Sequence, residues 1–198
     1  MIDYLAAPSR SDLIQRALLG GLVVAAITAL IGTWVIVRGL AFLGDALAHG
    51  VLPGLAVGVL WGINLTIAGL VSSLLMVAGV NLVHRTTRLS DDTGIGLLFV
   101  GMLALGVIII SRSDTGAGDL TSFLFGDILG VDRNDIVLGL VALGITIIGL
   151  LVGHRSFMAL AVNHEKAAAL GLRPGLAHAS MLALLALAVV VSFRVVGT

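Results

Sequence analysis

The sequence predicts an all-α membrane protein, a bundle of about six transmembrane helices with one further short re-entrant or interfacial helix. Apolar residues make up 59% of the 198 residues and charged residues only 11%, and the mean hydropathy is +1.16. A soluble chain of this length cannot bury so much apolar surface. Uncharged windows also recur with the length that a membrane-spanning helix needs, about 20 residues. We therefore expect a single multi-pass transmembrane domain over residues 1–198.

The uncharged windows place the individual spans. The expected spans are Ala17–Val37, the two halves of Ala46–Val83, Gly94–Ser111, Ile136–Gly153 and Pro174–Phe193. Trp61-Gly62-Ile63-Asn64 is the expected turn between the two halves of the long window. Asp119–Val131 is apolar but short, with an acid at each end of its core. A stretch this short rarely crosses a bilayer, so we expect a short helix there that does not span.

Six spans divide the basic residues between the two faces of the membrane. One face receives Arg38, Arg85, Arg88, Arg155, Lys166 and Arg173, and the other receives Arg10, Arg16, Arg112, Arg133 and Arg194. The first group is larger, so the positive-inside rule assigns it to the cytoplasm and places the amino terminus outside. If Asp119–Val131 did cross, the amino terminus would move to the inside.

A carboxylate and an imidazole stand four residues apart within apolar sequence. Asp45 and His49 lie in the segment RGLAFLGDALAHGVLPGLAVG, Arg38–Gly58. Helical spacing puts both side chains on one face, and ionisable groups at membrane depth mark ion or substrate pathways. Together they offer an oxygen and a nitrogen donor to a divalent metal such as manganese or zinc, with the neutral imidazole as the competent ligand. The alternative is an Asp–His hydrogen bond that only stabilises the helix.

Small residues follow this pair at regular spacing. Gly50, Gly54, Gly58 and Gly62 recur every four residues, which is typical of close packing between membrane helices. Pro53 lies within the same stripe and removes one backbone donor, so it predicts a kink. We interpret the glycines as packing residues.

A second informative segment, Phe157–Leu172, lies between the last two expected spans. It contains the only Lys and the only Glu of the chain, Lys166 and Glu165. Asn163 is a suitable N-cap and Gly171 a suitable terminator. The segment therefore predicts a short cytoplasmic helix with a smooth Ala167-Ala168-Ala169 surface that would fit a groove on a partner. An ordinary surface loop is the alternative.

Several functions are excluded by the residues. The formal net charge of zero argues against nucleic acid as a partner, because a phosphate-binding surface needs clustered basic residues. His164-Glu165 begins a zinc-protease pattern, but Ala168 stands in place of the second His. Lys166 has no phosphate-binding glycine pattern before it, so the chain does not bind ATP by that route and is not expected to be an enzyme.

Taken together, these motifs resemble the permease subunits of zinc and manganese ABC importers, the ABC-3 type. The resemblance rests on Arg38, Phe42–His49, Leu52-Pro53-Gly54, Asp92-Thr93-Gly94-Ile95-Gly96, the Asp119–Gly130 run and the loop containing Glu165, Ala168 and Gly171. It covers essentially the whole chain in order, and the first of these motifs is highly specific.

The resemblance implies a type II ABC importer permease: a homodimeric pore in a bacterial inner or plasma membrane, with a cytoplasmic ATPase subunit and an extracytoplasmic metal-binding protein as partners. Asp45 and His49 would line the path of zinc, manganese or iron, and no cofactor would be permanently bound. His164, Glu165, Lys166, Ala167, Ala168 and Gly171 would belong to the helix that couples the permease to the ATPase. Two other functions fit the same residues: a stand-alone secondary metal carrier or channel, and an inactive permease fragment.

Members of this family continue through further membrane helices beyond the position of Ser192-Phe193. We therefore expect that the C-terminal helices of the family are missing from residues 1–198, as in a truncated product, a fragment or one half of a split permease. On this expectation the polypeptide alone would not transport metal.

Overall fold

Helices form every regular element in the described part of the chain. The computed structural model describes residues 11–87, 89–112, 130–162 and 172–196. In chain order the helices are α2 (Asp12–Val37), α3 (Ala41–Gly50), α4 (Leu52–Trp61), α5 (Leu65–Thr86), α6 (Asp91–Ser111), α8 (Arg133–Val162) and α10 (Pro174–Val196). α3 and α4 together form one candidate span, Ala41–Trp61, so these ranges contain six helical segments long and apolar enough to cross a membrane. The predicted fold class is confirmed.

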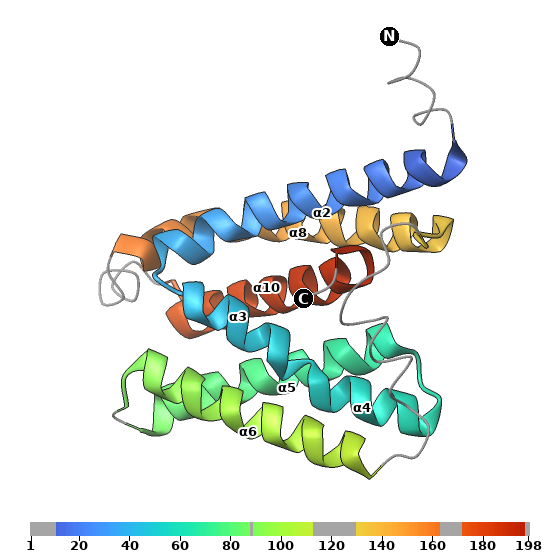
Figure 1. Ribbon diagram of the computed structural model, residues 1–198. Coiled ribbons are helices and arrows are strands. Elements are labelled where there is room, and N and C mark those ends of the chain that lie inside the picture. Colours follow the sequence, from blue (N-terminus) through green and yellow to red (C-terminus); the bar gives the residue numbers. More distant parts are fainter. Residues whose placement is uncertain (1–10, 88, 113–129, 163–171, 197–198) are drawn as a thin grey trace, which may run out of the picture.

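The helices form two groups, which meet through α3 and through the packing of α10 on α5. Figure 1 shows α2, α8 and α10 side by side, with α4, α5 and α6 forming the other group and α3 between them. The main core contains buried residues from both groups, among them Ile27 of α2, Leu47 of α3, Met76 of α5 and Leu182 of α10. Although α3 has only ten residues, it contacts helices of both groups, with α6 as its main partner.

The ends of the helices agree with six spans. Arg38 follows α2, Arg155 lies near the end of α8 and Arg173 precedes α10, and these three positions lie at one end of the bundle (Figure 1). α6 ends and α8 begins at the opposite end. If Asp119–Val131 does not cross the membrane, α6 must end and α8 must begin at the same end of the bundle, as they do here (Figure 1). Residues 119–129 themselves lie outside the described ranges.

Two element boundaries differ from the sequence-based expectation. The second span begins at Ala41 and not at Ala46, so Asp45 lies within it and not at its edge. α8 continues past Gly153 to Val162, whereas the uncharged window predicts a loop over Phe157–Val162. Phe157 is 1% exposed and packs edge-on against Trp34 of α2, with 5.6 Å between ring centroids. That contact gives the end of α8 a buried partner, and a hydropathy window cannot reveal it.

The glycine stripe packs against α5, as expected for close helix contact. A Cβ built on Gly50 would collide with the Met76 side chain, and one on Gly54 with the Ala68 carbonyl and Ser72. A Cβ on Gly58 would lie 3.0 Å from the Ala68 side chain. Gly62 has a different function, because its φ of 65° ends α4 in the left-handed conformation. Asn64 then caps α5 by accepting from the amides of Thr66 and Ile67, which confirms the predicted turn.

Substituting Gly54 by Ala should destabilise the bundle, because the added methyl meets the Ala68 backbone and the Cβ of Ser72, neither of which is the movable end of a side chain. Overpacking of this kind typically costs about 1–3 kcal/mol. Gly101→Ala in α6 is a matched control, since a Cβ at that position would have nothing within 4 Å and Ala is the better helix former. Thermal unfolding in detergent should show a lower midpoint for Gly54→Ala and an unchanged or higher midpoint for Gly101→Ala. Equal midpoints for the two variants would contradict the packing argument.

Candidate metal site

Asp45 and His49 lie one turn apart on α3, the first half of a span that is interrupted in its middle. α3 ends at Gly50, Val51 lies between the two helices, and α4 starts at Leu52 with Pro53 in its first turn. Because proline has no amide hydrogen, it is accommodated at the start of a helix better than in its interior. The interruption therefore follows directly from the position of Pro53, and it leaves the pair close to the end of α3.

The two donor side chains face away from the core. The opposite side of α3 is fully covered, with Leu43, Ala46 and Leu47 each 0% exposed. Asp45 is exposed and His49 is half-buried. Within the described ranges no hydrogen bond or ion pair joins Asp45 to His49. The alternative in which the pair only stabilises the helix through a mutual hydrogen bond is therefore not what this structure contains.

An aromatic ring from α6 packs on the histidine. The His49 ring lies edge-on to Phe99 of α6, with 5.2 Å between centroids and an interplanar angle of 75°. Phe42 of α3 also contacts Phe99, with 6.4 Å between ring centroids. Sequence reasoning does not identify Phe99, because it is far from His49 in the chain. Phe42 carries a usable signal, since it stands three residues before Asp45 and seven before His49 and therefore shares their face.

The chemistry of the donor set fits a divalent metal, although the described residues supply only part of a coordination sphere. A carboxylate oxygen and an imidazole nitrogen suit zinc, manganese and iron alike. Zinc typically takes four ligands, and harder cations take more. In the described part of the chain no group of three or more His, Asp or Glu side chains is placed to hold an ion. Further ligands would have to come from water or from another surface.

An apolar groove runs along the neighbouring face of α3. Its volume is about 310 Å³, and it lies between α2, α3 and α10. Gly44 and Ala48, the residues directly before Asp45 and His49, line it on the α3 side. α3 thus presents three different faces: a buried face, an apolar face along the groove, and the face that carries Asp45 and His49.

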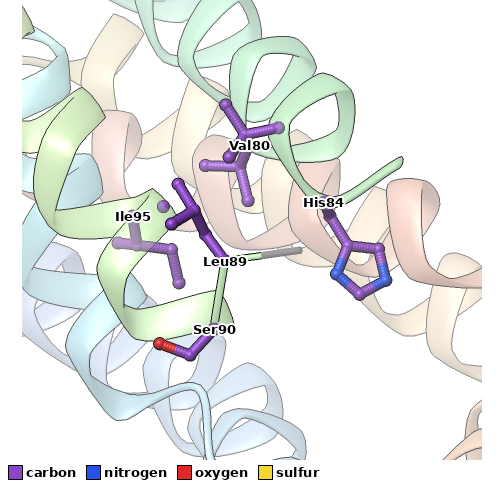
Figure 2. Close-up of a pocket in the computed structure, with 7 residues that line it drawn as sticks. Val80, His84, Leu89, Ser90 and Ile95 are labelled. Atoms are coloured by element: carbon purple, nitrogen blue, oxygen red, sulfur yellow. The ribbon is translucent and has the colours of Figure 1, made fainter. Parts of the chain in front are cut away.

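The histidines at the basic end of the bundle make structural contacts. A guanidinium nitrogen of Arg38 donates to Nδ1 of His178 at 3.3 Å, which links the end of α2 to α10. The rings of His84 and His178 lie 5.9 Å apart. Figure 2 shows His84 at the rim of a small pocket between α5 and α6, with its ring directed away from Leu89 and Ile95. This pocket measures about 10 Å³, room for one water at most.

The predicted coupling residues lie outside the described part of the chain. His164, Glu165, Lys166, Ala167, Ala168 and Gly171 all fall between 163 and 171. Their flanks are placed: α8 ends at Val162 and α10 begins at Pro174, both at the end of the bundle that carries Arg38 (Figure 1). The segment therefore starts and ends on the side with the larger basic group.

Comparison with known proteins identifies the family. The model of the ABC 3 transport family matches residues 10–198. A probable iron transport system membrane protein of Haemophilus influenzae is 33% identical over 197 residues, which cover 100% of this chain and 72% of that protein. The manganese transport system membrane protein MntC of Listeria monocytogenes is 31% identical, covering 93% of this chain and 65% of MntC.

A solved structure agrees with this assignment. The chain matches PsaBC from Streptococcus pneumoniae in complex with Fab with a TM-score of 0.82 and 27% identity. The match covers 100% of this chain and 71% of the other. The chain therefore spans about two thirds to three quarters of the length of these relatives. With the family model matching nearly the whole sequence and six apolar spans in the fold, the chain belongs to the ABC 3 transport family, the multi-pass membrane permeases of bacterial ABC transporters.

Proposed function

We propose that this chain is the metal-conducting permease subunit of an ABC importer for divalent cations, with zinc, manganese or iron as cargo. The observation that carries the proposal is the family match over residues 10–198 combined with the position of Asp45 and His49 on the open face of an interrupted span. Relatives named for iron and for manganese transport support two of these three metals. One Asp and one His do not select among the three.

The exposed carboxylate supports a second copy of the permease as the partner that completes the path. An ionised Asp that faces lipid costs up to about 2.5–3.5 kcal/mol on insertion scales, the value at the centre of a span, and Asp45 lies about one turn inside the start of its span. A two-fold interface between two copies would remove Asp45 from lipid. It would also bring two Asp45–His49 pairs together, which supplies four protein donors where the described residues of one chain place two.

The other two proposed partners would bind at opposite ends of the bundle. A cytoplasmic ATPase subunit would bind at the end that carries Arg38, where the segment containing His164–Gly171 joins α8 to α10. An extracytoplasmic metal-binding protein would deliver the cation at the opposite end. ATP hydrolysis then belongs to the ATPase subunit, and the metal passes Asp45 and His49 as cargo and not as a resident cofactor.

Uptake by membrane vesicles tests this function. Vesicles from cells that produce the transporter should accumulate radioactive manganese when ATP is supplied on the cytoplasmic side, and an imposed proton gradient alone should not drive uptake. Vesicles from cells that lack the chain are the control. Uptake driven by the proton gradient without ATP would contradict the proposal and would favour a secondary carrier that uses the same pair.

A further inference from the structure

The interruption between α3 and α4 contains a hydroxyl from a neighbouring helix. In a continuous helix the amide of residue 53 would bond to the carbonyl of His49, and the amide of Gly54 to the carbonyl of Gly50. The first bond cannot form, because Pro53 has no amide hydrogen. The second is replaced by Ser72 of α5. The Gly54 amide donates to Ser72 Oγ at 3.2 Å, and the Ser72 hydroxyl donates to the Gly50 carbonyl at 2.8 Å.

This bridge uses one serine hydroxyl as donor and acceptor at the same time. The hydroxyl has a single hydrogen, which goes to Gly50, and it accepts from Gly54. Ser72 is 4% exposed, so water cannot easily replace it, and a buried backbone group left without a partner is unfavourable. The close approach depends on the glycines, because a Cβ on Gly54 would collide with Ser72 itself. Gly50, Gly54 and Ser72 therefore form one joint, which connects α3, α4 and α5.

The joint lies next to the face of α3 that carries Asp45 and His49. His49 directly precedes Gly50, whose carbonyl accepts from Ser72, and its ring rests against Phe99 of α6. The direction in which α3 leaves this joint therefore sets where Asp45 and His49 present their donor atoms. In membrane transporters, interrupted helices commonly form the substrate site.

We propose that Ser72 is a positioning residue for the metal path, whose hydroxyl holds α3 and α4 in their interrupted arrangement and thereby fixes the orientation of Asp45 and His49. This inference rests on the proposed function of the pair. Without the hydroxyl, the Gly54 amide and the Gly50 carbonyl would be free to bond to each other, which would turn α3 relative to α4 and move both donors.

Ser73 provides a matched control on the same helix. Ser73 is 0% exposed, and its hydroxyl donates to the carbonyl of Leu70 within α5 at 2.9 Å. Ser72→Ala and Ser73→Ala thus remove the same group at equal depth, one from the joint and one from its own helix. Ser72→Thr retains the hydroxyl, and Ser72→Val has nearly the shape of Thr without it. The Thr and Val pair keeps the comparison available if the alanine variant does not reach the membrane.

The first measurement follows the arrangement of α3 relative to α4 and does not depend on metal binding. The chain contains no cysteine, so Ala41→Cys at the start of α3 and Leu60→Cys near the end of α4 can carry spin labels at two unique, exposed positions. We expect Ser72→Ala and Ser72→Val to shift or broaden the distance distribution between the labels, with Ser73→Ala and Ser72→Thr unchanged. An unchanged distribution in the variants without a hydroxyl at position 72 would overturn the inference.

The second measurement connects the joint to the metal. Binding of Mn²⁺ to the permease in lipid nanodiscs should weaken by about tenfold or more in Ser72→Ala, comparable to the loss of a residue that orients a ligand, and Ser73→Ala should bind like the wild type. Asp45→Asn separates the two hypotheses. Normal binding by Asp45→Asn would reject the proposed function itself. Loss of binding in Asp45→Asn with normal binding in Ser72→Ala would reject only the positioning by Ser72.

Discussion

Replacing Asp45 by Asn, or His49 by Ala, should reduce metal uptake by about 100-fold or more, beyond the loss caused by altering a group that merely supports a ligand. Each change removes one of the two donors that this chain presents on the open face of α3. Neither side chain contributes to the core, so membrane insertion and assembly with the ATPase should be preserved. Initial rates of manganese and zinc uptake, measured at matched amounts of protein in the membrane, provide the test.

Two control substitutions make the same chemical changes elsewhere. Asp12→Asn alters a carboxylate that is 84% exposed and pairs with Arg16 at 3.4 Å within α2. His154→Ala removes an imidazole that packs on Trp34 near the far end of α8. Both control variants should transport like the wild type. Normal uptake by either Asp45→Asn or His49→Ala would show that the pair is not the metal path.

The second large effect is expected at the coupling segment. Ala168→Arg should abolish binding of the ATPase subunit, because a long charged side chain would replace the small residue that the proposed docking surface presents. Metal binding at Asp45 and His49 should be unaffected, since the segment joins α8 to α10 and not to α3. Co-purification with the ATPase, together with Mn²⁺ binding by the same preparation, measures both properties.

Ile63→Arg provides the matched control for this change. Ile63 is 43% exposed and lies in the turn between α4 and α5, at the opposite end of the bundle from Arg38 (Figure 1). The same added charge at that end should leave ATPase binding intact. Retention of the ATPase by Ala168→Arg would show that His164–Gly171 is not the coupling element.

The spans were predictable from the sequence because a bilayer imposes one strong requirement. Each crossing needs a long apolar helix, and this determined the number of spans and the turn at Gly62 and Asn64. The limits of the helices were less predictable. Hydropathy ends α8 near Gly153, but burial of Phe157 against Trp34 continues the helix to Val162. Such contacts join residues that are far apart in the chain.

The candidate site, too, was only partly predictable from the sequence. Asp45 and His49 were identifiable because their spacing and their apolar surroundings are both local properties of the sequence. Ser72 gave no signal, since a serine in an apolar window more often bonds to its own helix, as the adjacent Ser73 does. Phe99 also became visible only when α6 was placed against α3. Sequence thus indicated the candidate donors, and the neighbouring groups Ser72 and Phe99 required the fold.

The contrast between α2 and the α3–α4 span has a consequence for the order in which the protein assembles during synthesis. α2 emerges first, yet its main partners α8 and α10 follow only after residue 133, at about 5–20 residues per second. α2 can remain in lipid without these partners, because the hydroxyls of Thr28 and Thr33 donate to carbonyls of their own helix at 2.9 and 2.8 Å.

The second span lacks this independence. Its interrupted backbone is completed by Ser72 of α5, so α3 and α4 cannot take up their interrupted arrangement with these polar groups satisfied before the third span arrives. We therefore expect the first span to leave the insertion machinery alone, and the second and third spans to leave it together, as one hairpin.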